Sequence, residues 1–223
     1  SNGNNFNKTA KINRTSFTSS FKINNPDFKL KHILTTSILF DNNNLSPITF
    51  TYSLKREFLN QFNVYLNTGK VYRFPTINDL YWNPGGNENL LPENGYTSDL
   101  GLVFTKKVNK ATLTFEPSLY SRWIDNWILW QPNGDFWSPM NVKKVWNRGI
   151  ETSSKFNISN KKLDYQFTIK TAYNMSTNVE VENSNNNSLN KQLIYTPHYK
   201  LVFKSQLKFK DLFFYNLHQK VNK

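Results

Sequence analysis

The stretch "LDYQFTIKTAY", residues 163–173, alternates apolar and polar side chains along its whole length. One set of alternate positions holds Leu163, Tyr165, Phe167, Ile169, Thr171 and Tyr173. The other set holds Asp164, Gln166, Thr168, Lys170 and Ala172. Successive side chains of a β-strand point to opposite faces of its sheet, so a period of two predicts a strand with one apolar and one polar face.

The same alternation recurs along the chain, whereas no segment of comparable length has the spacing of an amphipathic helix. It predicts about ten strands, several of them as long as a membrane-crossing strand must be. Their expected ranges are 14–24, 28–41, 47–56, 62–77, 96–107, 111–127, 144–158, 163–176, 196–209 and 212–219.

The connections between these strands alternate in length. Short turns are expected at residues 24–27, 56–61, 107–110, 159–162 and 210–211. Longer, irregular loops are expected at residues 78–95, 128–143 and 177–195, with a shorter one at 41–46. Short turns on one side and long loops on the other indicate an all-β, antiparallel, up-and-down sheet whose ends face different compartments, as in a transmembrane β-barrel.

Composition limits the classes of function. The 223 residues carry a net charge of +13, which suits an anionic partner, but the basic residues are scattered rather than gathered in runs. Cysteine is absent, which excludes disulfide frameworks and thiolate chemistry, and the three histidines lie far apart in the sequence. No stretch has the length of a transmembrane helix or of a signal-peptide core. The chain is therefore soluble, or crosses a membrane as strands, or belongs to something longer.

No motif for catalysis is present. The sequence contains no HExxH, no GxSxG and no glycine-rich phosphate loop. The carboxylates of Asp125, Asp135 and Glu151 occur singly, which favours solvated or pore-lining roles. We therefore expect no enzymatic activity, no cofactor and no metal site.

Three segments resemble TonB-dependent outer-membrane receptors. "RFPTINDLYW" (73–82) followed by "GNENLLPE" (86–93) is similar to a segment in the C-terminal half of these barrels, most closely in the vitamin B12 (cobalamin) receptor-like group. "NVKKVWNRGIE" (141–151) and "YTPHYKLVFKSQLKFKD" (195–211) are similar to later strands of the same family and follow in the same order. The motif residues are Arg73, Pro75, Asn78, Leu80, Tyr81, Asn87, Pro92, Glu93, Arg148, Gly149 and Glu151.

The resemblance implies a fold and a function. Residues 1–223 would be a partial barrel domain, with about ten strands of a barrel of about 22, and would lack both the plug and the closing strands. The protein would lie in the outer membrane of a Gram-negative bacterium and import a scarce, bulky nutrient, such as cobalamin or a related metal chelate (siderophore or haem). Its partners would be that ligand, membrane lipid and lipopolysaccharide, the TonB complex through a plug outside this chain and, as an open option, a surface lipoprotein, but no nucleic acid.

The resemblance also implies where a ligand enters. The loop after the "PTINDLY" strand would be extracellular, and a second loop would contribute tryptophans from the same side. The residues expected to contact ligand are Tyr81, Trp82, Asn83, Asn87, Glu88, Trp130 and Trp137. The alternative for any one of them is that it packs the loop against its neighbour.

Two other functions fit the sequence. A soluble β-rich module could bind carbohydrate or nucleic acid through surface aromatic rings and positive charge. An open half-barrel could also be a scaffold that a second polypeptide completes. The apolar faces separate the first of these from transport, because a soluble module would seal Tyr165, Phe167, Leu201 and Phe203 between two layers, whereas a barrel would turn them outward to lipid.

Overall fold

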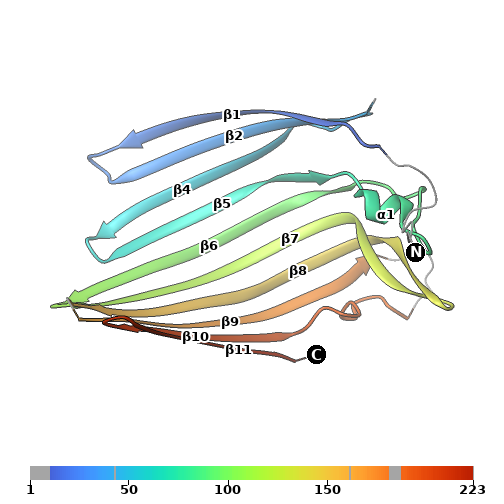
Figure 1. Ribbon diagram of the computed structural model, residues 1–223. Coiled ribbons are helices and arrows are strands. Elements are labelled where there is room, and N and C mark those ends of the chain that lie inside the picture. Colours follow the sequence, from blue (N-terminus) through green and yellow to red (C-terminus); the bar gives the residue numbers. More distant parts are fainter. Residues whose placement is uncertain (1–10, 43, 161, 181–186, 223) are drawn as a thin grey trace.

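The computed structural model describes residues 11–42, 44–160, 162–180 and 187–222. These residues form eleven β-strands and one short helix (Figure 1). In chain order they are β1 (Arg14–Asn25), β2 (Leu30–Asp41), β3 (Asn44–Leu45), β4 (Thr49–Leu59), β5 (Phe62–Arg73), α1 (Ile77–Tyr81), β6 (Glu93–Val108), β7 (Ala111–Asn133), β8 (Phe136–Ser159), β9 (Leu163–Glu180), β10 (Tyr199–Phe209) and β11 (Leu212–Asn222).

All strands belong to one antiparallel sheet. Its order is β1-β2-β4-β5-β6-β7-β8-β9-β10-β11, with the two-residue β3 paired to β2 alone. Each long strand therefore lies beside its neighbour in sequence, and β1 and β11 are the two edges. The prediction of an all-β, up-and-down antiparallel sheet is confirmed. In the described ranges, no helix has the length and apolarity that spanning a membrane requires.

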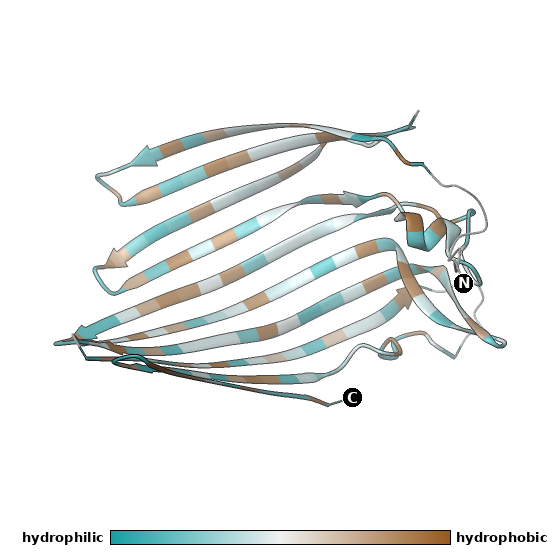
Figure 2. Ribbon diagram, in the orientation of Figure 1, coloured by the Kyte–Doolittle hydropathy of each residue, from teal (hydrophilic) through white to brown (hydrophobic). Residues whose placement is uncertain are grey.

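Hydrophilic and hydrophobic residues alternate in bands along the strands (Figure 2). Because successive side chains of a strand point to opposite faces, the alternation of residues 163–173 assigns its side chains to two faces. We call the inner face the one that carries the hollow lined by Glu116, Glu151 and Lys170, and the outer face the opposite one. Phe167 lies on the outer face, where its ring meets that of Phe203 at a centroid distance of 5.0 Å. Phe167 and Lys170 thus point to opposite faces, as predicted.

Apolar side chains line up across the outer face. Leu54, Leu66, Leu100, Leu119 and Ile150 are direct partners on five successive strands. Leu100 and Leu119 are 49% and 55% exposed. No second sheet covers this face among the described residues, so the predicted outward-facing apolar set is not sealed inside a two-layer body.

The two ends of the sheet differ as expected. The β1–β2, β4–β5, β6–β7, β8–β9 and β10–β11 turns all lie at one end, which we call the short-turn end (Figure 1). The β5–β6, β7–β8 and β9–β10 connections lie at the opposite, long-loop end. The predicted alternation of connection length is confirmed for the long β5–β6 and β9–β10 connections, but not for the β7–β8 connection.

The expected irregular loop at residues 128–143 is wrong. β7 and β8 continue through it as a paired hairpin, from Trp127 opposite Val142 to Asn133 opposite Phe136. The hairpin needs only a two-residue turn, in which Gly134 has a φ of +62°, a conformation that glycine adopts at little cost. Two prolines and this glycine make the segment look irregular in sequence, although Pro132 and Pro139 both keep positions in the ladder.

The expected strand at residues 62–77 is too long. β5 ends at Arg73, and the one-turn helix α1 begins four residues later. Thr76 caps this helix, because its hydroxyl accepts from the Asp79 amide while the Asp79 carboxylate accepts from the Thr76 amide. A helix this short has no apolar stripe to reveal it.

Buried apolar residues gather at the long-loop end. In the described residues they are Phe74, Leu90, Ile124, Ile128, Val145 and Leu193. Phe74 and Leu90 come from the β5–β6 connection and Leu193 from the β9–β10 connection, whereas the other three belong to β7 and β8. The long connections therefore pack onto the sheet and make a local core there.

Candidate ligand-binding site

Two long connections and the extended β7–β8 hairpin meet at the long-loop end. We call the described residues 74–92, 126–143 and 187–198 the loop platform. Its meeting point is Trp137, near the tip of the β7–β8 hairpin. The Trp137 ring lies 4.7 Å, centroid to centroid, from that of Tyr195 in the β9–β10 connection. Gly85 of the β5–β6 connection approaches Trp137 so closely that a Cβ there would lie 1.9 Å from the Trp137 carbonyl oxygen.

Asp79 joins α1 to the β7–β8 hairpin. One carboxylate oxygen accepts from the Thr76 amide at 2.8 Å, and the other accepts from the indole N–H of Trp130 at 2.9 Å. Burial opposes ionisation of this carboxylate, but these hydrogen bonds and the nearby Arg73 guanidinium outweigh it, so the pKa of Asp79 lies below its ordinary value. Asp79 is therefore ionised at neutral pH and links α1 to the β7–β8 hairpin.

Arg73 extends this network to β6. Its guanidinium donates to both carboxylate oxygens of Glu93, at 2.7 and 2.8 Å, and reaches Asp79 at 3.4 Å. Glu93 also accepts from the backbone amide of Ile128 at 2.8 Å. Two residues of the sequence motif, Arg73 and Glu93, thus hold the ends of their own loop together and fix the neighbouring hairpin.

Asparagine side chains fix the rest of the β5–β6 connection. Asn87 donates to the carbonyl oxygen of Pro139 at 3.1 Å. Asn141 accepts from the Leu91 amide at 2.8 Å and donates to the Leu91 carbonyl oxygen at 3.0 Å. The loop is consequently bound to the β7–β8 hairpin at several points and presents a defined surface.

The predicted contact residues separate into two groups. Trp130 and Asn87 bond to other parts of the platform through Asp79 and Pro139, so they support it. Tyr81 and Trp82 are half-buried, while Asn83 and Glu88 are exposed.

Trp137 is 45% exposed and Tyr195 is 54% exposed, so the pair offers two aromatic faces to solvent. Sequence reasoning missed Tyr195 and Asp79. A capping signature, Thr76 three residues before Asp79, marked the second of them.

Of the other motif residues in this connection, Pro75 is buried, Asn78 is exposed, and Leu80 and Pro92 are half-buried. The Pro75 carbonyl oxygen accepts from the Arg14 guanidinium at 2.5 Å, which ties the loop to the first strand of the sheet.

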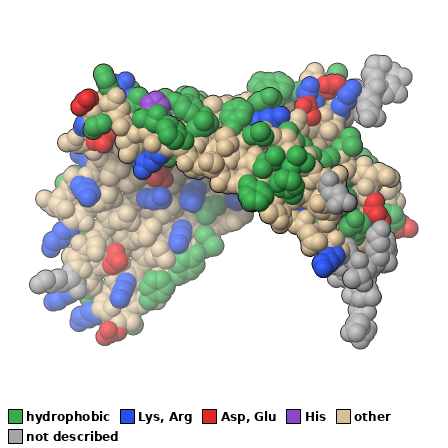
Figure 3. All heavy atoms as spheres, turned by 90° about the horizontal axis from the view of Figure 1, so that it is seen from above, with side chains coloured by type: hydrophobic (Ala, Val, Ile, Leu, Met, Phe, Trp, Pro, Cys, Tyr) green, Lys and Arg blue, Asp and Glu red, His purple; other side chains and the backbone are tan. Residues whose placement is uncertain are grey.

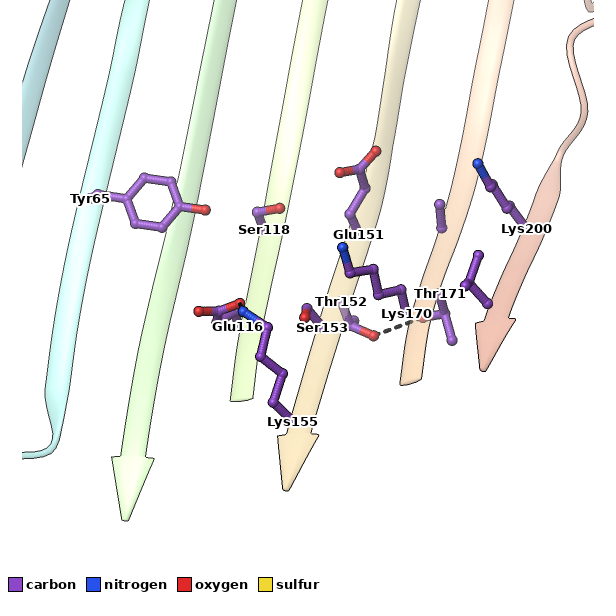
Figure 4. A pocket seen from close by; sticks show the side chains of 12 residues that line it. Tyr65, Glu116, Ser118, Glu151, Thr152, Ser153, Lys155, Lys170, Thr171 and Lys200 are labelled. Carbon is purple, nitrogen blue, oxygen red and sulfur yellow. Dashed lines mark hydrogen bonds and ion pairs between the residues drawn. The ribbon is translucent and has the colours of Figure 1, made fainter. Parts of the chain in front are cut away.

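The inner face below the platform contains a hollow of about 490 Å³ (Figure 4). Polar and charged side chains dominate its lining, and Lys155 pairs with Glu116 at 3.1 Å. Tyr65 lies flat across the neighbouring strand at Gly101, where an added Cβ would be 2.2 Å from the ring. The missing side chain of Gly101 therefore allows the Tyr65 ring to pack directly on the backbone of the neighbouring strand.

The second motif spans both faces. Gly149 and Glu151 lie on the inner face, where Gly149 leaves room for Tyr120, whose hydroxyl donates to Asn174 at 2.8 Å. Arg148 lies on the outer face, and its guanidinium carbon is 3.7 Å from the Trp146 ring centroid. Because successive side chains of a strand point to opposite faces, neighbouring motif residues contact different faces of the sheet.

The arrangement suits non-covalent binding. Exposed rings give stacking and apolar contact, and the hollow supplies hydroxyl and charged groups. Within the described ranges, no group of three or more His, Asp or Glu side chains could hold a metal ion.

Comparison with known proteins identifies relatives. The family model described as "TonB dependent receptor-like, beta-barrel" matches residues 3–219. The vitamin B12 transporter BtuB of Photobacterium profundum is 32% identical over 123 residues, which are 52% of this chain and 19% of that transporter. BtuB of Vibrio vulnificus is 35% identical over 95 residues, 40% of this chain and 14% of that transporter.

Solved structures share the fold. The copper transporter OprC superposes with a TM-score of 0.68 at 13% identity, over 94% of this chain and 35% of OprC. A mutant of the ferric enterobactin receptor PfeA from Pseudomonas aeruginosa gives a TM-score of 0.61 at 15% identity, over 90% of this chain and 31% of that receptor. The chain therefore spans well under half the length of these relatives.

Proposed function

Because this chain belongs to the TonB-dependent receptor β-barrel family, we propose that it forms part of the barrel wall of an outer-membrane receptor that imports a bulky metal chelate. Cobalamin is the leading candidate, since the two transporters with detectable sequence identity are named for vitamin B12. Siderophores and haem are the other candidates, and the ferric enterobactin receptor among the structural neighbours supports the first of them.

The observation that carries this proposal is the Trp137–Tyr195 pair on a platform fixed by Asp79, Arg73 and Glu93. Two exposed rings held by separate connections give a large amphipathic ligand a firm stacking surface without a large ordering cost on binding. Trp82, Asn83 and Glu88 lie in the same platform and supply further apolar and polar contacts.

The proposal orients the protein in the membrane. The long-loop end faces the exterior, the short-turn end faces the periplasm, and the outer face contacts lipid and lipopolysaccharide. Energy for transport comes from the TonB complex through a plug outside this chain, so residues 1–223 act as wall and entrance. A surface lipoprotein that covers the platform is compatible with this orientation.

The test is ligand binding by the full-length protein in detergent. Cyanocobalamin, ferric enterobactin and haemin are titrated separately while intrinsic tryptophan fluorescence is followed. We expect one of the three to bind, and we expect Trp137→Ala and Tyr195→Ala each to weaken its binding about five- to tenfold, as the loss of one aromatic contact does.

Trp123→Ala is the matched control, because this tryptophan lies on the outer face and belongs to none of the platform segments. Its binding constant should equal that of the unchanged protein. Binding of none of the three probes, or equal weakening by Trp123→Ala and Trp137→Ala, would reject the platform as the ligand site.

A further inference from the structure

Two Asn–Gly pairs lie in the part of the chain that the structure describes, and their surroundings differ. Asn133–Gly134 is at the tip of the β7–β8 hairpin, whereas Asn94–Gly95 lies within β6. An asparagine that precedes glycine is prone to lose its side-chain amide, because glycine has no side chain to hinder attack by its own backbone nitrogen. The fold therefore determines which of the two pairs can react.

The pair at the hairpin tip is exposed. Asn133 is the last paired residue of β7, opposite Phe136, so Gly134 and Asp135 form a two-residue turn. Gly134 has a φ of +62°, as the first central residue of a type II′ turn requires, and it has no partner in the ladder. Asn133 and Gly134 are both exposed, and a Cβ added at Gly134 would meet no described atom within 4 Å. Turns of this kind open at little cost in free energy.

The pair within β6 is held from both sides. Gly95 is buried, and it pairs with Val71 on β5 and with Ile124 on β7. A Cβ added at Gly95 would lie 2.0 Å from the carbonyl oxygen of Trp123, so the neighbouring backbone is tightly packed against it. The side-chain oxygen of Asn94 is buried as well. This pair can react only after β6 leaves the sheet.

We propose that Asn133 is a site of spontaneous deamidation, which alters the loop platform as the protein ages. The backbone nitrogen of Gly134 attacks Cγ of Asn133 and loses its proton, while the bond from Cγ to the side-chain nitrogen breaks and ammonia leaves. Water then opens the resulting succinimide ring at either of its two carbonyl carbons, which gives aspartate or isoaspartate. The net change is hydrolysis of one amide to a carboxylate and ammonia, with water as the only co-reactant.

The two products change the hairpin differently. Both add a negative charge next to Asp135, at an end of the molecule where Figure 3 shows acidic side chains in red, on the right of the view. Isoaspartate also adds one carbon to the main chain, which the two-residue turn of Gly134 and Asp135 cannot accommodate without loss of the Asn133–Phe136 pairing. Phe136 directly precedes Trp137 of the platform. Isoaspartate is therefore expected to displace Trp137, whereas aspartate leaves the turn intact.

The first experiment measures the rate at each pair. The full-length protein in detergent is kept in mildly alkaline buffer and digested at intervals. Mass spectrometry follows the peptides that contain Asn94 and Asn133, and chromatography separates their aspartate and isoaspartate forms. We expect Asn133 to be converted about tenfold faster than Asn94 or more, because only Asn94 must wait for a strand to open.

Unfolded protein is the control for this comparison. In urea the two pairs should react at similar rates, because both then have the chemistry of a free Asn–Gly pair. Equal rates in the folded protein, or an unchanged Asn133 where the unfolded protein forms product, would overturn the proposal. A difference in rate that persists in urea would also reject it, because flanking residues and not the fold would then be the cause.

The second experiment tests the effect on the platform. Hydrogen-exchange protection of residues 127–133 and 136–142 should be about tenfold lower or more in aged protein that contains isoaspartate. Asn133→Asp carries the charge on a normal main chain and should keep its protection, since an exposed charge contributes little. Aged Asn133→Gln is the matched control and should also keep it, because glutamine would have to close a larger ring.

Two results would overturn the effect on the platform. Unchanged protection in the aged, isoaspartate-containing protein would show that the hairpin tolerates the added carbon. An equal loss in fresh Asn133→Asp would show that charge, and not the change of main chain, opens the hairpin.

Discussion

The outer and inner faces come from the same strands but are built by different means. The outer face repeats leucine and aromatic side chains from strand to strand, and Trp123 stacks on Trp146 at 4.7 Å and 12°. The inner face combines tyrosines laid over glycines with charged side chains. The outer face therefore depends on composition alone, whereas the inner face depends on which residue is opposite which.

This difference predicts which substitutions should destabilise the protein on each face. On the outer face, the surrounding lipid determines how much a substitution destabilises the protein. A charged side chain is therefore destabilising at almost any position near the bilayer midplane. On the inner face, local packing determines how much a substitution destabilises the protein. One added methyl group is therefore destabilising at a glycine beneath a tyrosine, whereas a charged side chain is tolerated on this face.

The largest effect is expected from a charge on the outer face. Phe167→Arg should make folding into lipid vesicles less favourable by about 2–4 kcal/mol, because it places a guanidinium near the bilayer midplane. The measurement is the folded fraction after refolding from urea. Lys170→Gln, on the inner face of the same strand, is the control and should refold normally. Equal losses in the two variants would mean that the faces are assigned the wrong way round.

The inner face offers a sharper test at its glycines. Gly149→Ala should cost about 1–3 kcal/mol, because the new methyl group would lie 2.2 Å from the Tyr173 carbonyl oxygen, which the sheet cannot easily move. Gly101→Ala should cost less, since its methyl group meets only the Tyr65 ring.

A double substitution separates these two causes. Tyr65→Ala should cancel most of the cost of Gly101→Ala, whereas removing the Tyr120 ring should leave most of the cost of Gly149→Ala in place, as measured by urea unfolding. Strict additivity in the Tyr65 and Gly101 pair would show that the ring does not lie on the glycine.

These contrasts also explain what the sequence could reveal. Alternation follows directly from strand geometry, so the strands, their order, their faces and the difference between the two ends were predictable. The β7–β8 extension was not, because Pro132 and Pro139 break the pattern while still fitting the ladder. The loop platform was only partly predictable, because contacts such as Trp130 to Asp79 and Trp137 to Tyr195 join residues 51 and 58 positions apart in sequence.

A smaller, pH-dependent effect is expected where the inner face meets its loops. The pKa of Asp79 is lowered in the folded protein, so its stabilising contribution is complete above the unfolded pKa of about 3.9 and is lost as the pH falls through the folded value. Asp79→Asn should remove about 1–2 kcal/mol of local stability at neutral pH. The measurement is hydrogen-exchange protection of residues 76–82, corrected for intrinsic rates.

The control for this prediction is Asp135→Asn, since Asp135 is exposed in the β7–β8 turn. Protection in this variant should fall on acidification as it does in the unchanged protein. If the Asp79→Asn variant still loses as much hydrogen-exchange protection on acidification as the unchanged protein does, the lowered pKa of Asp79 is not the cause of that loss.

The smallest effect is expected from an aromatic pair on the outer face. Trp123→Ala should cost about 0.5–1.5 kcal/mol beyond the loss of lipid contact, because it removes the stacking on Trp146. Trp146→Ala should remove the same interaction, so the double variant should cost less than the two single variants together. Leu119→Ala, on the same face but without a stacking partner, measures the loss of lipid contact alone.

Because lipid surrounds the outer face whichever ring is missing, Trp123→Ala and Trp146→Ala should both still refold, in contrast to Phe167→Arg. Failure of Trp123→Ala to refold would show that specific pairing, and not apolar composition alone, determines the outer face as well.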